Sequence, residues 1–204
     1  LKVFRFQYDQ NPVYQQFCQH LQKDKTSVKR IEDIPFLPIQ FFKSHSVVSN
    51  SNPVQATFTS SGTTGMTTSK HIVTDVSMYE ESYRKGFSQF YGNIEDYVIL
   101  ALLPSYLERE GSSLIYMVED LIQSSNHSES GFYLNNHDEL IKKLIDLDQA
   151  GQNVILIGVT YALLDLIGKS SFKLQNTIIM ETGGMKGKRK EMIREELHEQ
   201  LCHG

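Results

Sequence analysis

A segment rich in hydroxyl and glycine residues, Thr59 to Lys70, carries the residue types that a polyphosphate ligand needs. Gly62 and Gly65 let the backbone adopt conformations that point several N–H groups into one concavity. Side-chain hydroxyls add donors for phosphate oxygens, and they belong to Thr59, Ser60, Ser61, Thr63 and Thr64. Lys70 adds a positive charge. The segment therefore predicts a phosphate-binding loop, and the alternative from the residues alone is a solvated Ser/Thr-rich turn.

Other known site patterns do not fit the chain. The Walker A pattern G-x-x-x-x-G-K-[ST] is satisfied neither by this segment nor by residues 183–188, and no G-x-G-x-x-G follows an expected strand. The chain has no G-x-S-x-G, so an α/β-hydrolase is not expected. His198, Cys202 and His203 are close enough on an expected helix to share a metal. Such side chains near a chain end are more often surface residues, and we expect no metal site.

Three stretches together resemble one enzyme family. Residues 60–65 (SSGTTG) are similar to the phosphate-loop signature of adenylate-forming enzymes, the group that contains acyl-CoA synthetases and firefly luciferase. Residues 103–114 (LPSYLEREGSSL) and 180–187 (METGGMKG) resemble the acyl-protein synthetase branch (LuxE type), which activates fatty acids in bacterial luminescence. All three occur in the family's order, and the resemblance extends from about Phe36 to the C-terminus. The combination is more specific than the loop alone and favours a nucleotide loop.

The resemblance implies roles for individual residues in binding ATP. The segment from Thr59 to Gly65, with Lys70, would bind the β- and γ-phosphates. Gly183 and Gly184 would let the backbone lie against adenine, with Glu181 orienting that turn. The alternative for this second segment is an ordinary strand-to-helix turn.

Tyr106 is the catalytic candidate that the resemblance implies. It occupies the place where relatives carry an aromatic residue or His near the substrate carboxylate and the α-phosphate. The alternative is a surface Tyr beside the proline turn at Pro104. Ser112 and Ser113, further along the same stretch, are interpreted as caps of the next helix.

Several family features are missing from the chain. In relatives a lysine follows the second glycine closely, beside a proline, whereas here residues 66–69 precede Lys70 without a proline. No Tyr-Gly-x-Thr-Glu segment, which supplies a Mg²⁺-binding Glu in relatives, is present. The ribose-binding Asp and the lysine-bearing C-terminal lid are absent too. We therefore interpret the chain as the N-terminal part of a longer enzyme, and the missing initiator Met agrees with this.

The pattern of apolar residues indicates the elements that must position these segments. β-Prone runs at 55–59 and 70–74 flank the hydroxyl-rich segment. Continuous apolar runs at 97–103, 154–157 and 177–180 are typical of strands buried on both faces of a parallel sheet. Helices are expected at 11–23, 75–91, 112–123, 138–150 and 188–201. The alternation predicts an α/β fold, a largely parallel sheet with helices on both faces. The resemblance makes it part of the large N-terminal domain of an adenylate-forming enzyme.

One internal boundary is expected in the polar, turn-rich stretch from Ser44 to Pro53. Residues 1–50 form a helical and extended arm, because Pro35 and Pro38 exclude a helix around them. Residues 51–204 are expected to form the N-terminal portion of an adenylation domain, without the lid.

Composition fits a globular chain and excludes several classes of partner. The 204 residues are 40% hydrophobic and 22% charged, with a net charge of −4, so no nucleic-acid partner is expected. No apolar run approaches the roughly 20 residues of a membrane helix, and the N-terminus lacks the apolar core of a signal peptide. Cys18 and Cys202 are expected to be reduced thiols in a cytoplasmic protein, with one long-range disulfide as the alternative.

The expected function is ATP-dependent activation of a carboxylic acid. The acid would attack the α-phosphate of MgATP, and the acyl group of the acyl-adenylate would pass to a thiol of coenzyme A or a partner protein. The resemblance implies a fatty or other apolar acid. Two alternatives stay open: a nucleotide-binding module without turnover, and an interaction domain whose Ser/Thr-rich segment is only a linker. We also expect apolar surface that supports a homodimer.

Overall fold

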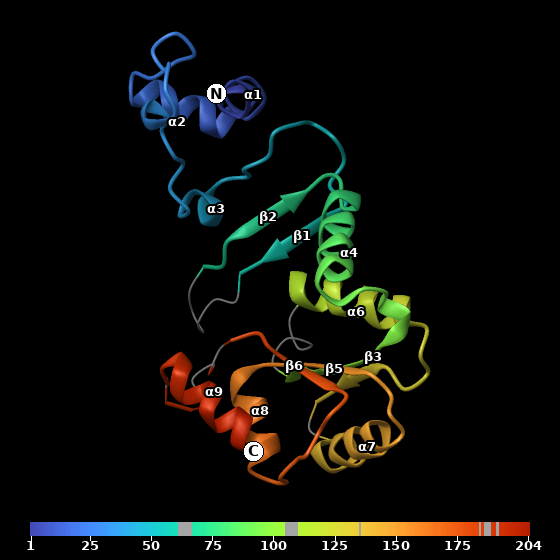
Figure 1. Ribbon diagram of the computed structural model, residues 1–204. Helices are drawn as coiled ribbons and strands as arrows, with labels where there is room; N and C mark the ends of the chain where they lie inside the picture. Colours follow the sequence, from blue (N-terminus) through green and yellow to red (C-terminus); the bar gives the residue numbers. More distant parts are fainter. Residues whose placement is uncertain (61–66, 105–109, 135, 184, 186–188, 191) are drawn as a thin grey trace. The chain divides into compact units, whose positions relative to one another are not determined.

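The computed structural model describes residues 1–60, 67–104, 110–134, 136–183, 185, 189–190 and 192–204. They form two compact units, each with its own apolar core. The first unit contains residues 1–81 and 110–113, and the second contains residues 82–109 and 114–204. The boundary expected near residue 51 falls inside the first unit, which includes both the expected arm and the strands beside the hydroxyl-rich segment. Figure 1 follows the chain from end to end.

The first unit begins with two short helices, α1 (Lys2–Gln10) and α2 (Pro12–His20). Asn11 starts α2 because its Oδ1 accepts a hydrogen bond from Tyr14 N at 3.1 Å, and Pro12 takes the first helical position. The helix expected at 11–23 is confirmed, although it ends at His20. α1 is not predicted by the sequence analysis, and it buries only Phe4 and Tyr8. These two rings pack with α2 in the core of this unit.

The remaining elements of the first unit lead to a β-hairpin. They are η1 (Ile31–Asp33), α3 (Phe41–Ser44), β1 (Ala56–Thr59) and β2 (Lys70–Val73). The strands β1 and β2 pair antiparallel as a separate two-stranded sheet. The prediction that two strands flank the hydroxyl-rich segment is therefore confirmed. Among the described residues, β1 and β2 pair with each other and not with a strand of the parallel sheet.

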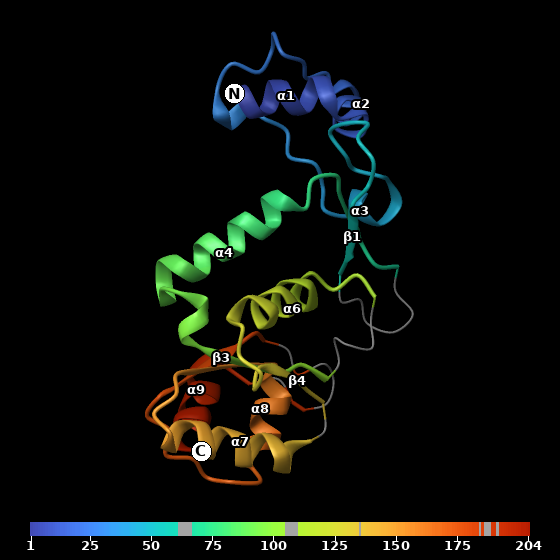
Figure 2. The same cartoon turned by 90° about the vertical axis from the view of Figure 1, so that its right-hand side faces the viewer.

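The second unit contains a four-stranded parallel sheet in the order β4-β3-β5-β6. Its strands are β3 (Val98–Leu102), β4 (Gly131–Tyr133), β5 (Val154–Gly158) and β6 (Thr177–Glu181). The helices are α4 (Ser77–Tyr91), which enters from the first unit, η2 (Ile94–Asp96), α6 (Ser113–Ser125), α7 (His137–Gln149), α8 (Thr160–Ile167) and α9 (Arg194–His203). In Figures 1 and 2, α6 covers one face of the sheet and α7 and α8 cover the other. The predicted α/β fold with helices on both faces is confirmed.

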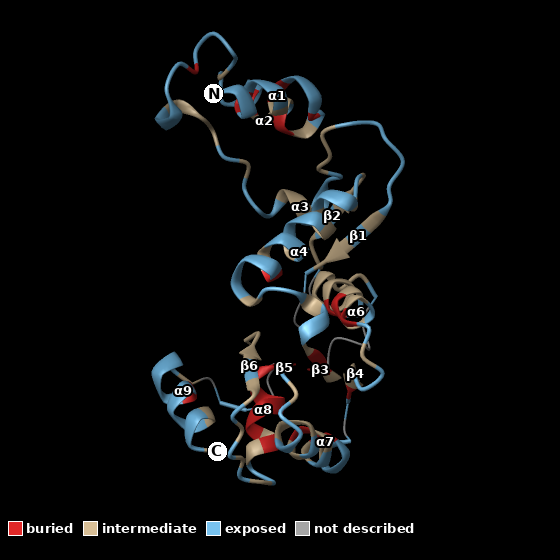
Figure 3. Ribbon diagram, turned by 45° about the vertical axis from the view of Figure 1, so that its right-hand side comes forward, coloured by how far each residue is buried: buried red, intermediate tan, exposed pale blue. Residues whose placement is uncertain are grey.

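The central strands β3 and β5 form the core of the second unit. Every residue of both strands is buried, as their continuous apolar runs predict. Figure 3 marks these strands and α8 as buried. The burial predicted for 177–180 is wrong: Ile178 and Ile179 of β6 are 38% and 43% exposed. β6 lies at the edge of the sheet beside β5, so Ile178 and Ile179 are covered less completely than the residues of the central strands.

The structure also tests the expected start of the C-terminal helix and the expected state of the two cysteines. The C-terminal helix, expected from residue 188, begins at Arg194 because Ile193 is extended, with ψ of 154°. Cys18 is buried and Cys202 is exposed, and both are free thiols. Within the described ranges, every helix falls short of the length and apolar content that crossing a lipid bilayer requires.

Candidate functional site

The carboxyl ends of β3 and β5 mark a switch point in the topology of the parallel sheet. β3 continues through α6 to β4 at one edge, whereas β5 continues through α8 to β6 at the other. Val159 N donates a hydrogen bond to Leu102 O at 3.3 Å, which holds the two strand ends together. Ligands of open α/β sheets bind in the crevice outside the carboxyl ends of the strands at such a point. The topology therefore predicts a ligand site at this edge of the second unit.

Glu181 organises the turn that follows β6 at the same edge. Its Oε1 accepts a hydrogen bond from Gly183 N at 2.7 Å and another from the hydroxyl of Thr160. Thr160 is the first residue of α8 and is only 3% exposed. One carboxylate therefore links the turn after β6 to the start of the helix after β5.

Gly183 gives this turn an open backbone surface. Its φ of +80° lies in the left-handed region, which glycine adopts without steric cost. A Cβ added to Gly183 would meet no atom of the described residues within 4 Å. On the inner side, Thr182 N and Thr182 Oγ1 both donate to Gly158 O, at 3.0 and 3.3 Å. The turn is thus fixed to the sheet on one side and accessible on the other.

A cavity of about 410 Å³ lies beside the turn. Its polar lining includes Thr160, Glu181 and Arg194, the exposed first residue of α9. Its apolar lining comes from Met185, Met192 and Leu197. Small-molecule sites combine apolar walls with a few placed polar groups, and a nucleoside with its flat base and polar sugar has matching chemistry. The residues present therefore fit a nucleoside.

The described part of the hydroxyl-rich segment lies in the first unit. Thr59 and Lys70 are register partners at the end of the β1–β2 hairpin. Beyond them, Ser60 N donates to Ser69 O at 3.0 Å, and Ser69 N donates to Ser60 Oγ at 3.1 Å. The hairpin therefore brings the two ends of the predicted phosphate loop together, with the Lys70 side chain exposed.

Gly111, from the second family-like stretch, packs against this hairpin. Thr59 N donates to Gly111 O at 2.8 Å, and Gly111 has a φ of +77°. An added Cβ would lie 3.0 Å from Thr57 O and 3.2 Å from Thr59 Oγ1. Glycine is thus required here for both conformation and space.

The variant Gly111→Ala is expected to loosen the end of β1. A non-glycine residue in the left-handed region costs about 1 to 2 kcal/mol, and the close contact with Thr57 O adds to this cost. Amide hydrogen exchange at Thr59 N should accelerate about tenfold in this variant. The control is Gly86→Ala within α4, where an added Cβ meets nothing and helix stability should rise by about 0.5 to 1 kcal/mol. Unchanged protection of the Thr59 amide in Gly111→Ala would refute the packing role.

Other predicted site residues lie outside the described ranges. They are Ser61, Gly62, Thr63, Thr64, Gly65, Tyr106 and Gly184. Their roles, and those of Thr59, Ser60, Lys70, Glu181 and Gly183 in binding ATP, stay predictions. Of the basic residues near Gly183, Arg189 forms an ion pair with Asp165 of α8.

Sequence reasoning missed Thr160, Thr182 and Arg194 as parts of the site. Thr160 follows the apolar run at 154–157 after only Gly158 and Val159. The rule that strand ends in a parallel sheet carry functional residues would have selected it. Arg194 carries no such signal, since it reaches the cavity only through the placement of α9.

The sheet and this edge define the class of the chain: an α/β protein with a candidate small-molecule site at the carboxyl ends of its parallel strands. The model of the family described as "Acyl-protein synthetase, LuxE" matches residues 1–202, and the chain belongs to this family. This confirms the family that the three stretches predicted.

Comparison with individual proteins gives a shorter match. A long-chain-fatty-acid–luciferin-component ligase of Photorhabdus luminescens is 37% identical over 67 residues, which are 32% of this chain and 57% of the relative. The match therefore spans less than two thirds of that relative's length. No solved structure matches the chain.

Proposed function

We propose that this chain supplies the nucleotide-binding part of a ligase that activates a fatty acid as its acyl-adenylate. A carboxylate oxygen attacks the α-phosphorus of ATP, the bond from that phosphorus to the β-bridging oxygen breaks, and pyrophosphate leaves. A thiolate of coenzyme A or of a partner protein then attacks the acyl carbonyl, which forms a thioester and releases AMP. Membership of the acyl-protein synthetase family and the ligase name of the Photorhabdus relative support this reaction class.

The turn from Glu181 to Gly183 is the structural observation that carries the proposal. It lies at the carboxyl edge of the sheet, where ligands of α/β folds bind. Its open backbone at Gly183 and the apolar side chains around the cavity suit a flat base. In this role Glu181 positions the turn, while Thr160 fixes the carboxylate from α8.

The phosphates of ATP are assigned to Thr59–Gly65 and Lys70, and Tyr106 is assigned to the reacting carboxylate and the α-phosphate. Mg²⁺ would be bound to the triphosphate and neutralise charge there. Among the residues that the structure describes, no three His, Cys, Asp or Glu side chains are grouped to hold a metal ion. In this assignment the segment from Thr59 to Gly65 supplies neutral donors, and Lys70 supplies one positive charge.

A double variant tests the assignment of the loop. Calorimetry with MgATP should detect binding to the wild type, and Gly62→Ala/Gly65→Ala should lower the affinity at least tenfold. The added methyl groups restrict the backbone and block the close approach of phosphate oxygens to N–H groups. Gly131→Ala in β4 is the matched control, because an added Cβ meets nothing there and the affinity should be unchanged. Equal ATP affinity in the double variant would refute the loop assignment.

A nucleotide-binding module without turnover is the second candidate. Acid-dependent release of pyrophosphate, assayed across a panel of acids, separates the two functions. ATP binding without any acid-dependent release would support the module. The proposal also includes a cytoplasmic location and a homodimer. Sedimentation velocity at several protein concentrations tests the homodimer, and a monomer at all of them would contradict it.

A further inference from the structure

Four residues of the second family-like stretch, 110–113, belong to the first unit, although the chain on both sides of them belongs to the second. They are Glu-Gly-Ser-Ser, and none of them is buried. Such a segment gains little from apolar burial, so hydrogen bonds must hold it in place. What this segment does therefore depends on the groups to which it is bonded.

Two hydrogen bonds join the segment to Thr59, the last residue of β1. Thr59 N donates to Gly111 O at 2.8 Å, and Thr59 Oγ1 donates to Glu110 O at 3.3 Å. Thr59 is the first residue of the predicted phosphate loop, and its register partner Lys70 is the residue at the other end. The segment 110–113 therefore holds the hairpin at the point where β1 leads into the loop.

A third hydrogen bond joins the segment to Tyr79, near the start of α4. Tyr79 OH donates to Ser113 O at 3.0 Å. The Tyr79 ring also packs edge-on against Phe58, with ring centroids 5.3 Å apart. Phe58 directly precedes Thr59 in β1. Tyr79 thus contacts both β1 and the segment that is bonded to β1.

The Tyr79 hydroxyl acts as a donor in this arrangement. Burial raises the pKa of the Tyr79 phenol, so the hydroxyl keeps its proton at physiological pH. The variant Tyr79→Phe would keep the ring against Phe58 and remove the donor to Ser113 O. This variant therefore separates the hydrogen bond from the ring contact.

We infer that Tyr79 is a positioning residue for phosphate binding, because it fixes residues 110–113 and these fix Thr59 at the entrance of the phosphate loop. The inference rests on the proposed function, which assigns the β- and γ-phosphates of ATP to this loop. Backbone N–H groups bind phosphate tightly only when the chain that carries them is held in one geometry beforehand. Tyr79 acts here through the bonded backbone and not through contact with the ligand.

Tyr79→Phe should weaken the binding of ligands that carry β- and γ-phosphates. Calorimetry should show about fivefold lower affinity for MgATP and for magnesium tripolyphosphate, since the entrance of the loop loses one of the bonds that hold it. The affinity for AMP, which lacks both phosphates, should stay within about twofold.

Tyr91→Phe is the matched control for this change. Tyr91 is on the same helix, and its ring also packs against a phenylalanine, Phe87, with centroids 5.2 Å apart. Within the described ranges the Tyr91 hydroxyl has no hydrogen bond to lose. All three affinities should therefore stay within about twofold of the wild type.

Amide hydrogen exchange separates positioning from a general loss of stability. In Tyr79→Phe the Thr59 amide, which is bonded to Gly111 O, should exchange about fivefold faster. The amide of Ile157, in the buried strand β5, should keep its wild-type rate. Equal acceleration at both amides would mean that the hydroxyl stabilises the whole fold, and would overturn the inference.

The binding results distinguish this inference from the proposed function. Wild-type affinity of Tyr79→Phe for MgATP and tripolyphosphate would overturn the positioning role and leave the phosphate assignment standing. An equal loss for AMP would overturn it too, because the effect would then not depend on the β- and γ-phosphates. A wild-type chain that binds neither MgATP nor tripolyphosphate would contradict the proposed function and the inference together.

Discussion

Glu181→Ala is expected to lower the affinity for ATP at least tenfold. The change removes the acceptor that Gly183 N and the Thr160 hydroxyl share, and hydrogen bonds to a charged group contribute about 1.5 to 3 kcal/mol each. It also leaves the buried hydroxyl of Thr160 without this partner. The turn that carries the open backbone at Gly183 then loses its fixed conformation. Calorimetric titration with MgATP measures the effect.

Glu181→Gln is the matched control for this change. Its amide oxygen accepts hydrogen bonds from the same position, so the ATP affinity should stay within about threefold of the wild type. Thr160→Val keeps the shape and removes only the hydroxyl, and should give an intermediate loss. Wild-type ATP affinity in Glu181→Ala, together with a lower melting temperature, would mean that Glu181 has a structural role alone.

Ile155→Ala should destabilise the second unit by about 3 to 4 kcal/mol, whereas Ile178→Ala should cost about 1 kcal/mol or less. The two side chains are register partners on neighbouring strands and are chemically identical. Ile155 is fully buried, so truncation leaves a cavity, while Ile178 is 38% exposed and already contacts water. Urea denaturation followed by far-ultraviolet circular dichroism measures both free energies.

Comparing Ile155→Ala with Ile178→Ala separates the effect of burial from the effects of residue type and of the unfolded state. Residue type, strand propensity and the unfolded chain are matched, so the difference between the two variants reports burial. Equal losses would mean that β6 is covered in solution to the same degree as β5. That result would restore the burial predicted for 177–180 and point to an occupant over β6.

The sequence predicts best where burial alone decides the structure. Continuous apolar runs mark β3 and β5, because both strands lie inside the sheet with helices over them. The same kind of run mispredicts the burial of β6, since an edge position is decided by strand order and leaves no trace in composition. α1 was missed because only Phe4 and Tyr8 are buried in it, too few to establish a helical period.

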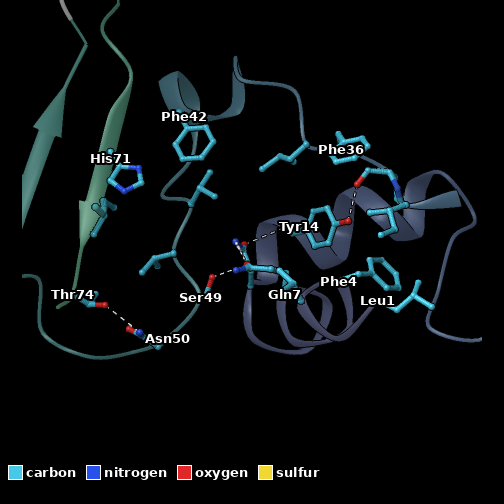
Figure 4. A pocket seen from close by; sticks show the side chains of 18 residues that line it. Leu1, Phe4, Gln7, Tyr14, Phe36, Phe42, Ser49, Asn50, His71 and Thr74 are labelled. Carbon is cyan, nitrogen blue, oxygen red and sulfur yellow. Dashed lines mark hydrogen bonds between the residues drawn. The ribbon is translucent and has the colours of Figure 1, made fainter. Parts of the chain in front are cut away.

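The candidate sites divide in the same way. Glu181 and Gly183 were selected through the resemblance of residues 180–187 to the family, and their place after an apolar run agrees with the rule about strand ends. A cavity of about 570 Å³ in the first unit (Figure 4) could not be predicted from the sequence, because its lining includes single residues of irregular segments such as 47–50. Their proximity depends on tertiary contacts like the hydrogen bond from Tyr14 to Pro35, which no periodicity predicts.

The shared carboxylate of Glu181 makes the turn after β6 and the beginning of α8 thermodynamically dependent on each other. A ligand that orders the turn also orders the acceptor of the Thr160 hydroxyl, and so opposes fraying of the helix. Such coupling is reciprocal, so in the proposed site a change that loosens the first turn of α8 would also weaken ligand binding at Gly183. The first turn of α8 would thus act as part of the proposed site, both through Glu181 and through Thr160 in the cavity lining.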